Sequence, residues 1–293
     1  MTVNFIPTCL ILLHSMIICC SCLGIWNGNF NKVLYPYSAN DRTPRTQHDY
    51  IRSGQEAAKR SQGRKEIAVD GIKGVFPLLI IFEYPSQVIY DFMHLVCLGH
   101  VPTLINRWCL IMSKESIVDI DQKLRALRFP RNSNVIFLES IKMVSQWKAK
   151  NCRLFILNIS VPLMGFALPK LIFSHFVTYA LAIKLLHASE NKEEIKFGQC
   201  LIDYYCRTAS RVYDPSIEIM SLHAHLHLAD QVFQHGGLAH TSAFAFEAAI
   251  RFILKKSSWQ CAFGLSNCIL DKYAMLKIIE ESLSIGRCFF GCK

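Results

Sequence analysis

Two carboxylates in apolar surroundings are the residues of this sequence best suited to chemistry. Asp91 follows the apolar run 77–84, and His94 lies three positions later, so the two side chains can share one face of a helical turn. A carboxylate at the junction of a strand and a helix is held in position and yet reachable, which suits a metal ligand. Glu247 lies in the aromatic and aliphatic run 242–256, where an unpaired carboxylate is costly. These residues indicate a candidate cation site.

Both carboxylates also have ordinary structural explanations. Asp91 suits a helix N-cap, because its short side chain can accept the first free backbone N–H groups of a helix. Glu247 can pair with Arg251, four residues later on the same helical face. From the residues alone we favour these two structural roles.

Cysteine and histidine clusters are the other metal-ligand candidates. Cys19 and Cys22 form a C-x-x-C pair, which supplies only two of the four ligands that a zinc site needs. His223 and His227 share a helical face, with His225 between them, but no third ligand follows at a recognisable spacing. We interpret the three histidines as structural.

The elements around these residues are predicted to be mostly helical, with a small β part. Residues 32–74 form a basic connector, interpreted as loop with short helical turns, and the run 77–84 predicts a buried strand. Apolar residues spaced by three and four predict the helices that follow. They span approximately residues 117–127, 171–186, 191–212, 216–235, 242–256 and 267–283. Asn191 and Ser242 are the expected N-caps of two of them.

Five strings in these elements occur in an order that is similar to a known family. They are GIKGVFPLL followed by DFMHLVCLGH (71–79 and 91–100), WKAKNCRLFIL (147–157), LPKLIFSHF (168–176), HAHLHLAD (223–230) and SAFAFE (242–247). The chain resembles the C-terminal part of the CACTA-type (DDE) transposases of animal genomes.

The resemblance implies an RNase H-like α/β core in which three carboxylates hold two Mg²⁺ or Mn²⁺ ions for phosphodiester cleavage and strand transfer. Asp91 would be the second acid, His94 its companion and Glu247 the third acid. The 156 positions between the two acids imply a helical insertion, residues 111–237. The remaining core would then comprise residues 75–110 and 238–285.

The first acid of the family is missing from its expected place. Asp41, Asp49 and Asp70 are the only aspartates before Asp91, and all three lie in the connector rather than in a credible strand. Two of three acids cannot hold a metal pair with the usual geometry. We therefore expect a truncated and inactive relative that binds no metal cofactor. A pseudogene product that does not fold stably is a further alternative.

Two other features depart from the family. Cys19 and Cys22 are interpreted as the remnant of a zinc-type C-x-x-C that the family carries upstream. Pro102 stands where the family helix continues, and proline in a helix interior is a helix breaker.

Composition bounds the partners and the compartment. Apolar residues make up 52% of the chain and charged residues 18%, which excludes a disordered tail. The net charge of +10 favours a polyanion such as DNA, with a protein as a further partner class. Thirteen cysteines, an odd number, often within apolar runs, favour a reducing compartment, the nucleus or cytoplasm.

The N-terminal segment supports a different function class. Residues 1–31 contain no charged side chain, and residues 5–25 are nearly continuous in apolar character, about the length of a membrane-spanning helix. The alternative hypothesis is a membrane-anchored or secreted protein without enzymatic activity. A scrambled strand of the ancestral core is the other explanation of this segment.

Overall fold

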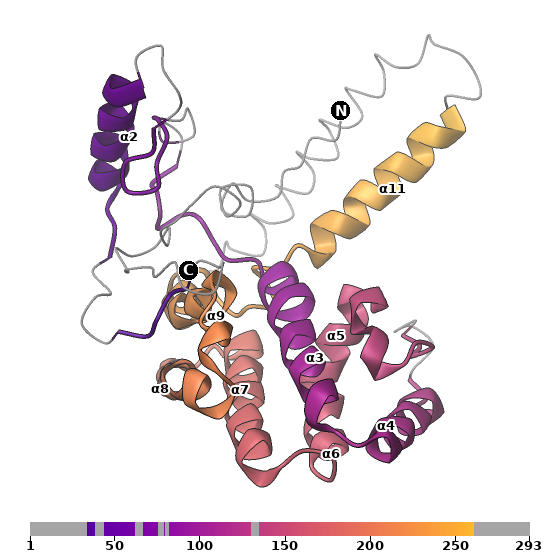
Figure 1. Ribbon diagram of the computed structural model, residues 1–293. Coiled ribbons are helices and arrows are strands. Elements are labelled where there is room, and N and C mark those ends of the chain that lie inside the picture. Colours follow the sequence, from indigo (N-terminus) through magenta and orange to yellow (C-terminus); the bar gives the residue numbers. More distant parts are fainter. Residues whose placement is uncertain are drawn as a thin grey trace. The chain divides into compact units, whose positions relative to one another are not determined.

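The computed structural model of the protein describes residues 34–38, 44–61, 67–75, 79, 82–129 and 135–260 (Figure 1). This part of the chain is mostly helical, as predicted. The α-helices are α2 (Gln47–Ser61), α3 (Val101–Ile111), α4 (Lys114–Ala126), α5 (Ala149–Leu154), α6 (Ser160–Met164), α7 (Lys170–Ala188), α8 (Lys192–Val212), α9 (Met220–Ala224), α10 (Leu228–His235) and α11 (Phe244–Gln260). Between them lie π-helical turns η3 (Met93–His100) and η6 (Phe155–Ile159) and 3-10 turns η5 (Ile141–Gln146), η7 (Pro215–Ile217) and η8 (His225–His227). The chain divides into two compact units, Met1–Ser242 and Ala243–Lys293.

The first unit has its core in the pair α7 and α8, against which α10 and the turn η8 pack. The predicted helices 117–127, 171–186 and 191–212 are confirmed, with boundaries close to those expected. Asn191 caps α8 as predicted, because its side chain accepts the backbone N–H of Glu193 at 2.9 Å. Gly198 lets the two helices approach closely, since a Cβ there would lie 3.0 Å from Leu186 Cδ2.

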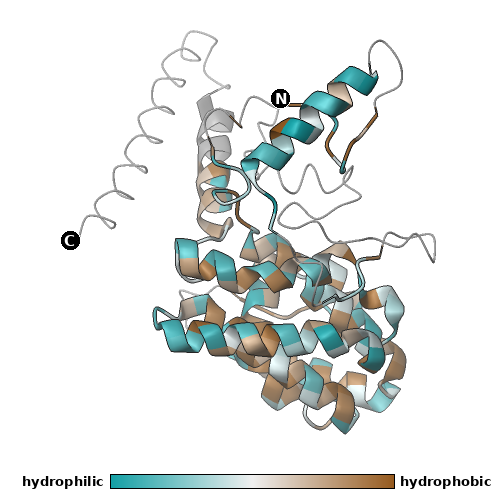
Figure 2. Ribbon diagram, turned by 90° about the vertical axis from the view of Figure 1, so that its left-hand side faces the viewer, coloured by the Kyte–Doolittle hydropathy of each residue, from teal (hydrophilic) through white to brown (hydrophobic). Residues whose placement is uncertain are grey.

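The connector contains a 15-residue helix, α2, where loop was predicted. Its buried face consists of Tyr50, Ser53, Gly54 and Ala57. Three of these four residues are small, so the buried positions repeat with the helical period although the hydrophobic residues do not. Figure 2 shows that α2 is largely hydrophilic. The helix is held by packing against segment 67–75 rather than by an apolar stripe.

Gly54 is the point of closest approach between α2 and this segment. A Cβ on Gly54 would lie 2.8 Å from both Gly74 C and Val75 N, whereas a Cβ on Gly74 meets nothing within 4 Å. Gly54→Ala is therefore expected to destabilise the packing of α2 by about 2 kcal/mol, even though alanine favours a helix by about 1 kcal/mol. Amide hydrogen exchange of α2 should become at least about tenfold faster.

The matched control is Gly74→Ala, which should leave exchange in α2 unchanged. Equal exchange in the two variants would show that the close approach at Gly54 does not hold α2 in place.

The predicted strand 77–84 is wrong for the residues that can be compared. Leu79 lies in a 3-10 turn and Phe82–Tyr84 lie in a bend and turn, and the described residues contain no strand, only an isolated bridge between Val69 and Ile72. A strand needs a neighbouring strand for its backbone groups. Here α2 takes that place: Gln47 Nε2 donates to the Leu79 carbonyl at 2.7 Å, and the rings of Tyr50 and Tyr84 meet edge to face at 4.3 Å.

The helix predicted for 216–235 is divided into η7, α9, η8 and α10. At His225 the backbone N–H bonds the Leu222 carbonyl, while the imidazole Nδ1 bonds the Ser221 carbonyl at 2.6 Å. The side chain thus takes the carbonyl that a regular α-helix would give to the backbone. The period of the sequence could not show this competition.

Helix α11 forms as predicted, but its cap differs. The helix begins at Phe244, which puts Ala243 rather than Ser242 at the N-cap position. The hydroxyl of Ser242 is buried and has no hydrogen-bond partner among the described residues. Residues 267–283 and the N-terminal segment 1–31 lie outside the described residues.

Candidate functional site

Asp91 lies at the start of the helix that continues as η3, and its carboxylate caps that helix. Oδ2 accepts the backbone N–H of His94 at 2.9 Å and Oδ1 accepts that of Met93 at 3.3 Å. The Asp91 carbonyl accepts the N–H of Leu95 at 2.8 Å, closing the first turn. The structural role predicted for Asp91 is thereby confirmed.

The same carboxylate holds the His94 side chain. Imidazole Nδ1 of His94 is hydrogen-bonded to Asp91 Oδ2, so the two residues share a helical face as the i, i+3 spacing predicted. The Asp91 side chain is 3% exposed and that of His94 is 20% exposed. The pair is therefore a buried carboxylate behind a partly accessible imidazole, an arrangement that fixes the orientation of the ring.

The helix does not break at Pro102, contrary to the prediction. The π-helical turn η3 ends directly before it, with Val101 N–H bonded to the Val96 carbonyl, and Pro102 lies in the first turn of α3. Proline lacks a backbone N–H, and the change from the π-helical to the α-helical hydrogen-bond pattern falls at this point of the continuous helical backbone. The Gly99 carbonyl is satisfied by the hydroxyl of Thr103 at 2.9 Å.

Helix α5 packs against η3, the turn that contains His94. Burial raises the pKa of the Cys97 thiol well above its usual value, and Cys152 and Asp91 raise it further, while Arg153 opposes them. The thiol therefore stays protonated at neutral pH and is not a nucleophile. Asp91 and Arg153 carry opposite charges, and both lie close enough to Cys97 to affect its pKa.

Glu247 lies in the second compact unit, in the first turn of α11. Its backbone N–H donates to the Ala243 carbonyl at 2.8 Å, and its side chain is partly exposed. Within the described part of the chain, no ion pair joins it to Arg251, so the predicted pairing is not observed. Convergence of Glu247 with Asp91, in the first unit, stays a prediction.

Two of the upstream aspartates have local structural roles. Asp49 and Thr46 form a reciprocal cap at the start of α2, with Asp49 Oδ2 accepting the Thr46 N–H at 2.9 Å and its hydroxyl at 2.8 Å. These bonds lower the pKa of Asp49. Asp70 lies in a tight turn with φ of 48° and accepts the Ser53 hydroxyl at 2.7 Å. Asp41, Cys19 and Cys22 lie outside the described residues.

Sequence reasoning missed a buried cluster of histidines and tyrosines in the first unit. His100 Nε2 bonds the Tyr205 hydroxyl at 2.7 Å, and His225 Nε2 bonds the Tyr179 hydroxyl at 2.9 Å. His175 Nε2 meets the Tyr205 carbonyl at 3.1 Å. The three histidines fall in three separate strings of the resemblance, but spacing along the chain could not show that they meet. His225 thus takes part in this core rather than in a metal site.

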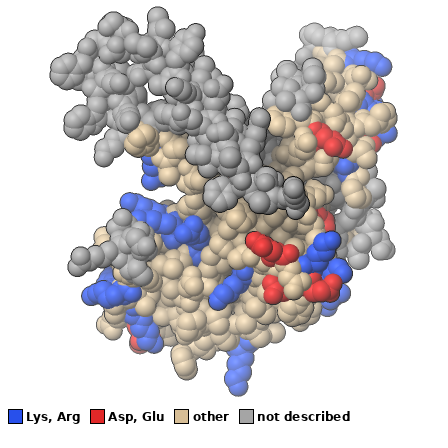
Figure 3. Space-filling model, turned by 180° about the vertical axis from the view of Figure 1, so that it is seen from behind, with Lys and Arg blue, Asp and Glu red and all other residues tan. Residues whose placement is uncertain are grey.

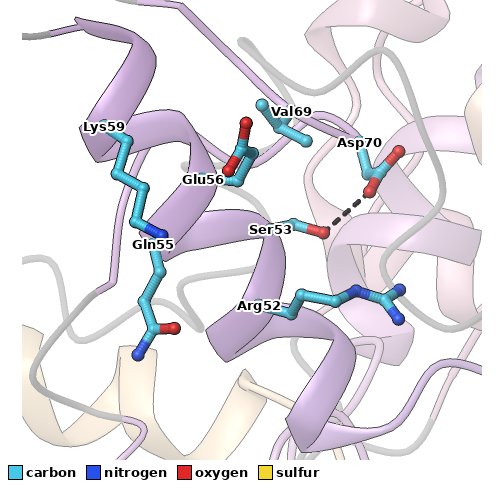
Figure 4. A pocket seen from close by; sticks show the side chains of 7 residues that line it. All are labelled: Arg52, Ser53, Gln55, Glu56, Lys59, Val69 and Asp70. Atoms are coloured by element: carbon cyan, nitrogen blue, oxygen red, sulfur yellow. Dashed lines mark hydrogen bonds between the residues drawn. The ribbon is translucent and has the colours of Figure 1, made fainter.

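A cavity of about 290 Å³ lies beside α2, away from the predicted site residues (Figure 4). It is lined by Arg52, Ser53, Gln55, Glu56, Lys59, Val69 and Asp70. Figure 4 shows the Ser53–Asp70 hydrogen bond at its wall, and Arg52 and Glu56 already pair with Asp49 and Arg60. The charges of Arg52 and Glu56 are thus paired within α2.

The Asp91 carboxylate is engaged by groups of its own helical turn. Both carboxylate oxygens accept N–H groups, and one of them also bonds the His94 imidazole. Among the residues that the structure describes, no three His, Cys, Asp or Glu side chains form a group that could hold a metal ion. As described, the pair can orient an imidazole at a partly open surface.

Comparisons of the chain with protein-family models, with curated proteins and with solved structures find no match. In the described part, one helix, α7, is long and apolar enough to cross a membrane, a test that the core helix of a soluble protein also passes. Its buried side chains include Phe176, Tyr179 and Ile183.

Proposed function

We propose that this chain is a transposable-element-derived protein, a remnant of a CACTA-type DDE transposase that has lost catalysis and retains contact with DNA. The observation that carries the proposal is the D-x-x-H string, which folds as one unit: the Asp91 carboxylate both caps the helix and orients His94. This pairing agrees with what the resemblance implies for the string, in which the histidine is the companion of the acid.

The proposed ancestry assigns a role to each part of the chain. Residues 75–110 and 238–285 would be the remnant of an RNase H-like core, and residues 111–237 its helical insertion. In the ancestor Asp91 and Glu247 would have held Mg²⁺ or Mn²⁺, which stabilise the attacking and leaving oxygens of phosphodiester cleavage.

Loss of catalysis is supported by how the acids are used here. The Asp91 carboxylate is 3% exposed and bonds backbone and imidazole N–H groups of its own turn, which is a structural use of an acid. Asp49 and Asp70 are bonded within α2 and its adjoining turn.

Contact with DNA is supported by a basic segment next to the Asp91–His94 pair. Residues 121–153 carry eight Lys and Arg against two Asp and Glu, so they hold more than half of the net charge. Helix α5, which bears Lys150 and Arg153, packs against η3. In Figure 3 blue side chains are spread over the lower part of the face shown, and most of the red ones there gather at the right, beside further blue ones. Phosphates are the natural partners of such a surface.

Replacing the exposed Lys142, Lys148 and Arg153 with Gln is expected to weaken binding of duplex DNA. Removing one cation that binds a phosphate should reduce the slope of log K against log salt by about one. Fluorescence anisotropy at several salt concentrations measures both quantities. The control is Lys192→Gln with Lys196→Gln, two exposed lysines on α8, which should leave the slope unchanged. Binding that is absent or insensitive to salt would contradict the DNA contact.

Nicking of supercoiled DNA in the presence of Mg²⁺ tests the loss of catalysis. We expect no cleavage above a protein-free reaction. Robust cleavage that is abolished in a folded Asp91→Asn variant, whose amide oxygen can still cap the helix, would show an active enzyme and overturn that part of the proposal.

A further inference from the structure

The side-chain amide of Gln231 connects two distant segments of the first unit. Its Oε1 accepts the backbone N–H of Tyr90 at 2.8 Å, and its Nε2 donates to the Tyr90 carbonyl at 3.0 Å. The same Nε2 donates to the Thr241 hydroxyl at 3.0 Å. Gln231, Tyr90 and Thr241 are all buried. One amide thus satisfies both backbone groups of the residue that directly precedes Asp91.

The segment at the other end of this bridge is fixed as well. Leu238 N–H donates to the Leu186 carbonyl at 2.9 Å and Ala239 N–H to the His187 carbonyl at 3.0 Å, which ties the segment to the end of α7. Thr241 follows two residues later and lies six positions before Glu247 in the sequence. Gln231 therefore joins the start of the Asp91 turn to the segment that precedes Glu247 in the sequence.

We infer that Gln231 is the positioning residue of the Asp91–His94 pair. Only an amide has the donor and acceptor that the Tyr90 peptide needs together, with a second donor for Thr241. The bonds fix the peptide groups on both sides of Tyr90, and the second of them leads into Asp91, whose side chain accepts the N–H groups of Met93 and His94. That the pair belongs to a DNA-contacting site rests on the proposed function; the positioning role does not.

The test is Gln231→Met in the full chain, a change of similar size that removes all three hydrogen bonds. Amide exchange measured by NMR should become at least about tenfold faster at Tyr90, Met93 and His94. The resonance of the His94 imidazole proton that bonds Asp91 should broaden or shift. Core amides of α7, such as Tyr179, should exchange as in the wild type.

The matched control is Gln234→Met on the same helix, since Gln234 is exposed. It should leave the amides of Tyr90, Met93 and His94 unchanged. Faster exchange at Tyr90 alone, with Met93, His94 and the imidazole resonance unchanged, would overturn the inference, because Gln231 would then hold the backbone without positioning the pair.

Thr241→Val decides the matter if Gln231→Met does not fold. It removes one of the two acceptors that hold the Gln231 Nε2, so exchange at Met93 and His94 should still rise about threefold. No change there would reject the positioning role. The DNA-binding titration of the wild type distinguishes the proposed function from this inference. If the wild type binds no DNA but the variants show these exchange effects, the proposed function is contradicted and the positioning role of Gln231 is supported.

Discussion

Lowering the pH from 7 to 4 is expected to remove most of the stability of the first unit. Burial lowers the pKa of both His175 and His225 from 6.5 to about 4, and lowers that of His100 well below its usual value. Above pH 6.5 these rings are neutral in both states, so the stability is complete there. Below pH 6.5 the unfolded chain binds protons that the folded chain does not.

The size of the effect follows from the width of that pH window. At pH 4, proton binding to the unfolded chain at each of His175 and His225 lowers the free energy of unfolding by about 3 kcal/mol. The sum is comparable with the whole free energy of unfolding of a typical domain. Thermal unfolding followed by circular dichroism should show a Tm that is nearly constant from pH 7.5 to 6.5 and falls steeply below pH 6.

The geometry of the cluster explains why protonation is so costly. His225 is 0% exposed and uses both ring nitrogens, Nδ1 toward Ser221 O and Nε2 toward the Tyr179 hydroxyl. The His100 ring lies 4.7 Å from that of His225, so a charge on one disfavours a charge on the other. The positive charge of Arg107 lowers the pKa of His100 further.

His225→Gln provides the specific test, because glutamine keeps polar atoms but does not titrate. The variant should be less stable at pH 7 but should lose about 3 kcal/mol less than the wild type on acidification to pH 4. His48→Gln, at an exposed position of α2, should keep the wild-type pH profile. A Tm that is flat down to pH 4.5, or an unchanged acid sensitivity in His225→Gln, would contradict the role of the cluster.

Asp91→Ala is expected to lower the free energy of unfolding by about 3 kcal/mol. The change removes a helix cap, at a cost of about 1 kcal/mol, and leaves the His94 imidazole without its buried carboxylate partner, at a further cost of about 2 kcal/mol. Asp91→Asn should cost less, since an amide oxygen can still cap the helix. Urea unfolding of the three proteins measures the differences.

Asp49→Ala is the matched control, because Asp49 also caps a helix but lies near the surface. It should cost only about 1 kcal/mol. An acid kept for catalysis is commonly strained, so its removal stabilises the protein. If Asp91→Ala is more stable than the wild type, the structural role of this carboxylate is wrong and an active site becomes the better explanation.

Sequence by itself determined the features that depend on neighbours along the chain. The Asp91–His94 pair follows from a three-residue spacing within one turn, and the cap of α8 follows from Asn191 with Glu194 three residues later. Helix α4 follows from apolar residues spaced by three and four, and α7 follows from an apolar stretch that begins after Pro169. Helix α8 follows from its cap and from apolar residues that continue to Val212. In each case the interacting residues lie within one or a few helical turns, so their spacing along the sequence predicts their relative positions.

Only the tertiary structure decided the features that join distant residues. Helix α2 was not predicted because its buried face contains Gly54 and Ala57. These small residues let the backbone of segment 67–75 approach the helix, but they add little hydrophobic character to the sequence pattern. The run 77–84 was misassigned because an apolar run does not show whether its partner is a strand or a helix. Gln231 reaches Tyr90 across 141 positions, and His100 reaches Tyr205 across 105. Such contacts form when folding closes long loops, and no local period records which polar groups then meet.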